Sequence, residues 1–336
     1  MRMRTLGKTG ISVSEIGFGT GGISRLMVGD DREAQLRAVR GALDGGVNFF
    51  DTAMGYGSGE SEANLGAALN RLGAEVVLTT KIRLTAEERE APEKAVVASV
   101  EKSLERLGRP RVDLIQIHNY VAPGRDWPVG EVVFDLHDIY GVGGVLDGFM
   151  ELRDRGLVRF FGFTGIGHPA ALAEMVDSGE FHTVQAYFNL LNPSAAYPVP
   201  EGFSAVDYGL LIERAASIGM GVLAIRALAL GALTVEPNLL GFLDERPPVL
   251  SLGSEYDEDV ARAEKLSFLV REDCTLAQAA LRFAGNKDDS RSRWACGIQQ
   301  RRHRHVAAVA LANKNIRIAW ALLQNGGTYR EEVSMA

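Results

Sequence analysis

The 336-residue chain contains very little cysteine and no excess of positive charge. Its only cysteines, Cys274 and Cys296, are too few for a disulfide framework, and neither has another cysteine or a histidine at the spacing of a zinc site. We therefore expect a protein of a reducing compartment that holds no metal. The net charge of -7 argues against a nucleic-acid partner, because phosphate contacts need clustered lysine and arginine.

Long apolar runs are also missing. No stretch of about 18 apolar residues occurs, and residues 1–6 lack the apolar core of a secretory signal. These absences predict a cytoplasmic protein that does not enter a membrane and whose partners are small molecules. The hydrophobic content of 46% is sufficient for a large core. Since α/β barrels of this length are commonly undivided, we predict one domain over residues 1–336.

Short apolar segments alternate with amphipathic segments along most of the chain. Residues 4–14 predict a β-hairpin with its turn at residues 7–10. Seven predicted strands follow, at residues 15–20, 47–50, 76–81, 112–118, 158–164, 183–190 and 221–227. The predicted helices between and after them include residues 31–43, 92–107, 145–155, 170–176 and 208–216, and one more around residues 65–72. Strands that are apolar throughout are typical of a parallel sheet covered on both faces.

Two architectures fit this alternation, an open doubly wound sheet and a closed eight-stranded barrel. Polar and ionisable residues stand at the ends of several different strands, and only a barrel brings all those ends to one rim. An open sheet would carry a glycine-rich phosphate loop after its first strand, and residues 17–22 have the wrong spacing for one. The pattern favours a (β/α)8 TIM barrel with a short N-terminal β-hairpin.

Three of the strand ends carry the residues Asp51, Lys81 and His118, and Tyr56 follows Asp51 in a glycine-rich turn. Alternation along each strand allows the first three side chains to point into one mouth. Taken singly, such residues are more often a helix cap, a solvent-facing lysine or a structural histidine. Their joint arrangement favours a catalytic site.

The chemistry of this set is proton transfer. A phenol is a weak acid at neutral pH, and an ammonium group beside it favours the phenolate. Lys81 would have this effect on Tyr56, while Asp51 would keep Lys81 charged and oriented. His118 could orient or polarise a carbonyl oxygen placed between it and Tyr56.

Residues 48–62, 77–81 and 113–118 together resemble the aldo-keto reductase family, and the resemblance extends over roughly residues 4–284. It implies a barrel enzyme that reduces carbonyls or oxidises alcohols with a nicotinamide cofactor and without metal. By position in the family pattern, Tyr56 would be the proton donor and Lys81 and Asp51 its tuning pair. His118 would orient the substrate.

The same resemblance implies contacts with the cofactor. Thr164 and Gln185 occupy the positions that hold the nicotinamide carboxamide, although Gly165 stands where an asparagine is common. Tyr187 would be the aromatic residue stacked under the nicotinamide. Its neighbour Phe188 is the alternative, and ordinary core packing explains either residue equally well.

Arg226 follows the seventh strand, in the segment that approaches the pyrophosphate in the family. The arginine makes this segment resemble that of the aldose and pyridoxal dehydrogenase-like branch of the family. The resemblance hints at a substrate like those of that branch.

The eighth strand expected after residue 284 is replaced by a charged tract at residues 285–298, which would be costly in a barrel wall. Gly297, Gln299, Arg301 and Arg302 nevertheless fall where a turn leads into the phosphate-binding helix of the family. Binding of a 2′-phosphate by Arg301 or Arg302 would favour NADP(H) over NAD(H). A solvated basic face, divergence or a reading-frame error are the alternatives. Residues 316–323 resemble the closing C-terminal helix of the family.

The sequence thus predicts an NADP-dependent aldo-keto reductase that reduces a small aldehyde or ketone or oxidises a sugar-like alcohol, with Tyr56 as general acid and base. The alternative is a non-catalytic nicotinamide-binding regulatory protein on the same fold, like the channel-associated subunits of the family. A metal-dependent barrel hydrolase is disfavoured, because histidines and carboxylates do not gather at several strand ends.

Overall fold

The computed structural model describes residues 1–21, 26–234, 256–270 and 274–284. Its central element is a seven-stranded sheet in the order β11-β10-β9-β6-β5-β4-β3, in which all neighbouring strands are parallel. The strands are β3 (Phe18–Gly19), β4 (Phe49–Asp51), β5 (Val77–Ile82), β6 (Val112–Ile117), β9 (Val158–Thr164), β10 (Thr183–Tyr187) and β11 (Gly221–Ile225). Each lies in or next to a strand segment predicted from the sequence.

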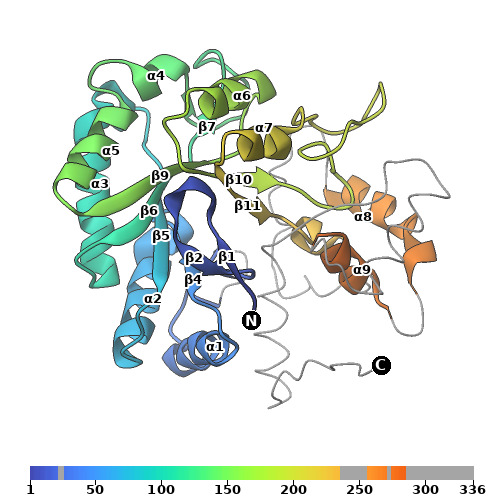
Figure 1. Cartoon of the computed structure of the whole chain (residues 1–336), viewed down its shortest axis with the longest axis horizontal. Helices are drawn as coiled ribbons and strands as arrows, with labels where there is room; N and C mark the ends of the chain where they lie inside the picture. Colours follow the sequence, from blue (N-terminus) through green and yellow to red (C-terminus); the bar gives the residue numbers. More distant parts are fainter. Residues whose placement is uncertain (22–25, 235–255, 271–273, 285–336) are drawn as a thin grey trace.

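Most helices cover the outside of this sheet, and the last two lie to one side of it, beyond β11 (Figure 1). The helices are α1 (Arg32–Asp44), α2 (Glu60–Arg71), α3 (Pro92–Leu107), α4 (Leu136–Tyr140), α5 (Val145–Asp154), α6 (Pro169–Asp177), α7 (Leu211–Ser217), α8 (Tyr256–Glu264) and α9 (Leu276–Phe283). Local signals set several of their ends. Asp31 caps α1 by accepting a hydrogen bond from the Ala34 amide at 2.9 Å, and α3 begins at a proline.

The sheet is strongly curled. Gln185 in β10 donates a hydrogen bond of 2.8 Å to Asp51 in β4, although β9, β6 and β5 lie between these two strands in the sheet. Only a sheet that bends back on itself brings the two side chains together. This curl, with helices outside, is the predicted (β/α)8 architecture. The predicted eighth strand and C-terminal helix lie outside the described residues.

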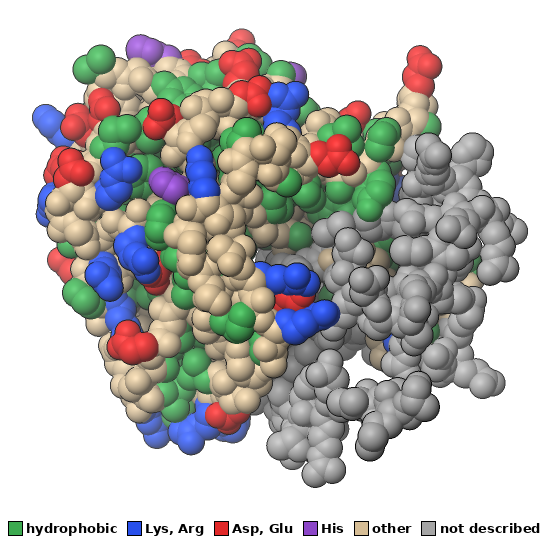
Figure 2. All heavy atoms as spheres, viewed as in Figure 1, with side chains coloured by type: hydrophobic (Ala, Val, Ile, Leu, Met, Phe, Trp, Pro, Cys, Tyr) green, Lys and Arg blue, Asp and Glu red, His purple; other side chains and the backbone are tan. Residues whose placement is uncertain are grey.

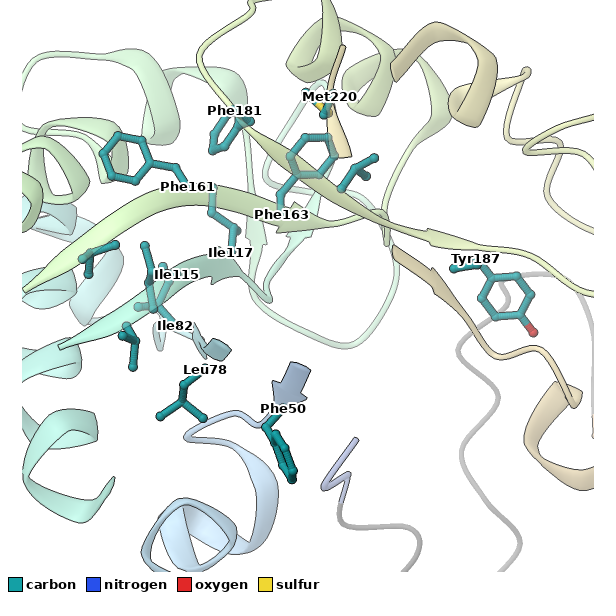
Figure 3. Close-up of a cluster of buried hydrophobic side chains, with 14 of the residues drawn as sticks. Phe50, Leu78, Ile82, Ile115, Ile117, Phe161, Phe163, Phe181, Tyr187 and Met220 are labelled. Atoms are coloured by element: carbon teal, nitrogen blue, oxygen red, sulfur yellow. The ribbon is translucent and has the colours of Figure 1, made fainter. Parts of the chain in front are cut away.

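Alternation along the strands separates two sets of side chains. One set packs between the sheet and the helices (Figure 3). Seven of its members are at most 3% exposed: Phe50, Leu78, Ile82, Ile115, Ile117, Phe161 and Phe163. The other set points into the interior of the curl and contains polar residues, among them Thr79, Lys81 and Gln116. The strands therefore build the core on one face and a polar interior on the other.

The hairpin of β1 (Met3–Thr5) and β2 (Ser12–Ser14) closes the amino-terminal end of the curl. Leu6 and Val13 pack there against Phe49. The turn is held by a hydrogen bond of 2.6 Å from the Lys8 amide to the Gly219 carbonyl. Gly7 allows this contact, because a Cβ atom on it would lie 2.2 Å from the Gly221 nitrogen. The carboxyl ends of the strands form the opposite rim.

A small parallel pair, β7 (Tyr120–Val121) and β8 (Val133–Phe134), follows β6. A bridge between Val121 and Gly167 ties it to the segment after β9. The sequence predicted no strand in the connection between residues 118 and 158. The bridge fixes this connection beside the rim.

Candidate active site

A buried ammonium group joins two predicted catalytic residues at the carboxyl ends of the strands. Lys81 Nζ in β5 donates to Asp51 Oδ2 at 2.7 Å and to the Tyr56 hydroxyl at 3.3 Å. A third hydrogen bond of 2.9 Å reaches the Thr52 carbonyl. Lys81 therefore uses each of its three N–H bonds, and Asp51 and Tyr56 are held on either side of one charge.

Electrostatics keep this lysine protonated. Its side chain has no exposed surface, whereas that of Asp51 is 18% exposed. Burial alone would lower the pKa of Lys81, but the Asp51 carboxylate and the Tyr56 hydroxyl outweigh burial and raise it above the value of an ordinary lysine. Lys81 is thus a fixed positive charge beside the phenol of Tyr56 at neutral pH.

The Asp51 carboxylate is fixed from the other side by two amides. Its Oδ1 atom accepts from Gln185 Nε2 at 2.8 Å and from Gln116 Nε2 at 3.4 Å. Gln116 is in turn positioned by a bond of 3.0 Å to the Thr79 hydroxyl. Asp51 therefore has a single orientation, in which Oδ2 remains for Lys81.

Tyr56 stands at the start of a short 3-10 turn, η3 (Tyr56–Gly59), whose last residue lies beside Arg106 of helix α3. Gly59 has a φ of 94°, and a Cβ atom there would lie 2.6 Å from Arg106 of α3. Arg106 is anchored by an ion pair of 2.6 Å with the buried Glu62. The glycine-rich sequence thus allows the turn to pack closely on a fixed neighbour, which holds Tyr56 in place.

His118, directly after β6, faces Tyr56. The two rings meet edge to face with centroids 5.7 Å apart, and the His118 amide donates to the Ile82 carbonyl at 2.9 Å. Burial lowers the pKa of His118 well below that of an ordinary histidine, and the charges of Lys81, Arg83 and Arg226 act in the same direction. The imidazole is therefore neutral at physiological pH and offers one N–H donor.

Two of the predicted carboxamide contacts lie in the same interior. Thr164 ends β9 and is 3% exposed, and its buried hydroxyl has no hydrogen-bond partner among the described residues. Gln185 already binds Asp51. Gly165 has a steric explanation, since a Cβ atom there would lie 2.9 Å from the Gln185 carbonyl oxygen. A buried hydroxyl and an amide in this place suit a small polar group of a ligand.

The predicted aromatic contacts are both packed in the core. Tyr187 stacks on Tyr208 at 5.8 Å, and Phe188 stacks on Phe283 at 5.7 Å. Arg226 follows β11 in a left-handed conformation with a φ of 63°. The remaining predicted cofactor residues, Gly297, Gln299, Arg301 and Arg302, lie outside the described residues.

Sequence reasoning missed two residues of this site. Gln116 binds Asp51, and Arg83, directly after β5, acts on the charge state of His118. Strand alternation could have identified both residues, because Gln116 shares a face with His118 and Arg83 shares one with Lys81. Their side-chain types alone gave no reason to select them.

The part of the chain that the structure describes contains no group of three or more histidine, cysteine or acidic residues placed to hold a metal ion. Within the same residues, no helix is long and apolar enough to cross a membrane. On the face shown in Figure 2, acidic and basic side chains of the described residues are interspersed.

Comparisons with known proteins place this geometry in context. Residues 15–327 match the model of the Aldo/keto reductase family. The chain is 31% identical to "Aldo-keto reductase YhdN" of Bacillus subtilis over 201 residues, which are 56% of this chain and 54% of that protein. It is 28% identical over 239 residues to "L-galactose dehydrogenase" of Arabidopsis thaliana, covering 70% of this chain and 67% of the relative.

Among solved structures, the holo form of aldo-keto reductase AKR11C1 from Bacillus halodurans has the same fold. Its TM-score is 0.61 at 22% identity, over 98% of this chain and 92% of that one. A short stretch of the chain also resembles a protein of another class. Over 54 residues, 16% of each protein, the chain is 57% identical to a "Probable family 20 transposase" of Pseudomonas aeruginosa.

Proposed function

Because this chain belongs to the aldo/keto reductase family, we propose that it is an NADP-dependent oxidoreductase that reduces a small aldehyde or ketone, or oxidises a sugar-like alcohol. The observation that carries the proposal is Lys81, which binds both Asp51 and the Tyr56 hydroxyl. The proposal treats residues 1–336 as one domain. A cytoplasmic location fits its low cysteine content.

The nicotinamide, when bound, supplies or accepts the hydride. Tyr56 handles the substrate oxygen: in reduction its O–H donates a proton to the oxygen that becomes the alcohol. The Lys81 ammonium, 3.3 Å away, stabilises the phenolate that remains. In oxidation the same phenolate accepts the alcohol proton. Asp51 supports both directions by keeping Lys81 charged.

His118 orients the carbonyl. A neutral imidazole can donate its one N–H to the carbonyl oxygen without competing with Tyr56 as a proton source. The edge-to-face contact of the two rings, with centroids 5.7 Å apart, supports a shared role of His118 and Tyr56. The substrate oxygen would sit between them and be polarised from two sides.

Residues of the curl and of the last part of the chain would hold the cofactor. Thr164 and Gln185 would bind the carboxamide, and Tyr187 would contact the nicotinamide ring. Gly297 and Gln299 would approach the pyrophosphate. Arg301 and Arg302 would bind a 2′-phosphate, which is the reason to favour NADP(H) over NAD(H).

The test combines nucleotide binding with turnover. NADPH and NADH are titrated by fluorescence, and a panel of small aldehydes is then assayed with the wild type and with Tyr56→Phe. Loss of the proton donor should lower kcat by about 100-fold or more, while NADPH still binds. Undiminished turnover by Tyr56→Phe would overturn the role of Tyr56.

Tyr140→Phe is the matched control, because it removes a phenol hydroxyl that donates to Ser178, a partner outside the site. It should turn over the same aldehydes at the wild-type rate. Binding of nucleotide by the wild type without turnover of any carbonyl or alcohol would favour the regulatory alternative.

A further inference from the structure

We propose that Arg83 and Arg226 make this site select carbonyl substrates that carry an anionic group, a carboxylate or a phosphate. The inference rests on the proposed function, because it concerns the substrate of the same site. Both residues stand directly after strands, β5 and β11, that are far apart in the sheet order. The curl brings the ends of these strands to one rim.

The backbone of Arg226 is held in an unusual conformation. Its φ of 63° is unfavourable for a residue with a side chain, and strain of this kind is concentrated at functional sites. Two hydrogen bonds to its carbonyl maintain it, from Asn189 Nδ2 at 3.0 Å and from the Ala229 amide at 2.8 Å. The conformation gives the guanidinium a fixed starting point at the rim.

The surroundings of Arg226 are those of the active site. Its charge interacts with Tyr56, Tyr120, Tyr187 and Tyr208, and it also acts on His118. Arg226 is only partly exposed and its Nη1 atom is buried, so the guanidinium is poorly hydrated, and this burial lowers its pKa. A poorly hydrated cation beside the substrate-orienting histidine gains from an anionic ligand.

Arg83 approaches from the other side. Its side chain lies beside Gly55, the residue before Tyr56. A Cβ atom added to Gly55 would lie 3.9 Å from the Cδ atom of Arg83. Arg83 forms an ion pair of 2.6 Å with Glu131, in which the side chains are 38% and 47% exposed. An exposed pair of this kind is weak, so Arg83 can exchange Glu131 for an anion on a substrate.

The charges around His118 support this division of roles. Asp51 compensates Lys81 at 2.7 Å, so that pair leaves little net field for a substrate. Arg83 and Arg226 both act to lower the pKa values of His118 and Tyr120, so both positive charges lie near the proposed substrate-orienting residue. Planar guanidinium groups suit the oxygens of carboxylate and phosphate.

Paired substrates test the inference on the full-length protein. For succinic semialdehyde against butanal, and glyceraldehyde 3-phosphate against glyceraldehyde, we expect kcat/KM to favour the anion at least tenfold at low salt. The preference should shrink as ionic strength rises. Arg226→Gln should reduce this ratio at least tenfold, and Arg83→Gln should reduce it by a smaller factor.

Arg155→Gln is the control, because Arg155 pairs with Glu101 and Glu151 on the outer helices and should leave the ratio unchanged. A wild-type ratio near one, or the same ratio in Arg226→Gln, would overturn the inference. Weaker NADPH binding by Arg226→Gln at an unchanged ratio would assign Arg226 to the pyrophosphate instead.

A second measurement does not depend on turnover. Calorimetric titration of the NADPH-loaded protein with succinate should show binding that Arg226→Gln weakens at least tenfold. Equal succinate affinity in the two proteins would count against the inference. Absence of turnover with every aldehyde, neutral or anionic, would instead contradict the proposed function.

Discussion

Gln185 Nε2 and Asp51 Oδ1 lie 2.8 Å apart across the interior of the curled sheet, although 134 positions separate the two residues in the chain. The Asp51 carboxylate thereby connects Gln185, a proposed cofactor contact, with Lys81. Lys81 is the positive charge beside Tyr56, the proposed proton donor. Substitutions at Asp51 should therefore change both the stability of the protein and its chemistry.

Asp51→Asn should destabilise the protein strongly, because it leaves the Lys81 ammonium buried without its counter-charge. Breaking a buried pair in this way typically costs about 3–5 kcal/mol of unfolding free energy. The double variant Asp51→Asn with Lys81→Met removes the stranded charge and should recover a large part of that loss in urea unfolding. Neither variant should reduce aldehydes at the wild-type rate. Additive losses in the double variant would contradict the coupling.

His118 should make the protein less stable in acid. Its folded pKa is lowered, so below the unfolded value of about 6.5 the unfolded chain binds a proton that the folded chain does not. Stability from this group is complete above that pH and is lost as the pH falls. The slope approaches about 1.4 kcal/mol per pH unit.

His118→Gln should remove that slope from urea unfolding measured between about pH 6.5 and 5. Burial also lowers the pKa of His182. This histidine is present in both proteins, so it contributes the dependence of stability on pH that remains in His118→Gln. Equal slopes in the wild type and His118→Gln would show that the imidazole is not buried in its neutral form.

Two helix glycines should respond to alanine in opposite directions. In α2, a Cβ atom on Gly66 would lie 2.3 Å from the Leu107 carbonyl oxygen of α3, so Gly66→Ala should cost about 1–3 kcal/mol through overpacking. In α1, a Cβ atom on Gly41 meets nothing within 4 Å, so Gly41→Ala should stabilise by about 0.5–1 kcal/mol. Urea unfolding measures both, and a stabilising Gly66→Ala would disprove the close packing of α2 on α3.

Local signals explain what could be predicted from the sequence. Pro92 and Gly108 bound α3 where the pattern placed it, because proline suits the first turn and Gly108, with a φ of 59°, ends the helix. The predicted strand over residues 158–164 is β9 without change. Of the first predicted strand, residues 15–20, only Phe18–Gly19 pairs with β4, since the hairpin engages Glu15.

Long-range contacts explain what could not be predicted. The hydrogen bonds of Gln116 and Gln185 to Asp51 depend on how far the sheet curls, and no local pattern encodes that angle. The bridge of Val121 to Gly167 is equally non-local, so no strand was predicted in the connection after β6. Alternation along each strand gives the face of a residue but not its partner across the interior.

The proposed preference for NADP(H) can be tested at Arg301 and Arg302. Replacing both with alanine should weaken NADPH binding by about 10- to 100-fold, because charged hydrogen bonds to the 2′-phosphate are lost. NADH, which lacks that phosphate, should bind as it does to the wild type. Fluorescence titration of both nucleotides measures the two affinities.

This experiment has a second outcome, which would contradict the proposed preference. Residues 285–298 depart from the expected barrel pattern, and Arg301 and Arg302 follow shortly after them. If these arginines belong to a solvated basic face and contact no nucleotide, the double variant would bind NADPH as tightly as the wild type. That result would remove the argument for NADP(H) over NAD(H), whereas the proton-transfer role of Tyr56 is tested separately by Tyr56→Phe.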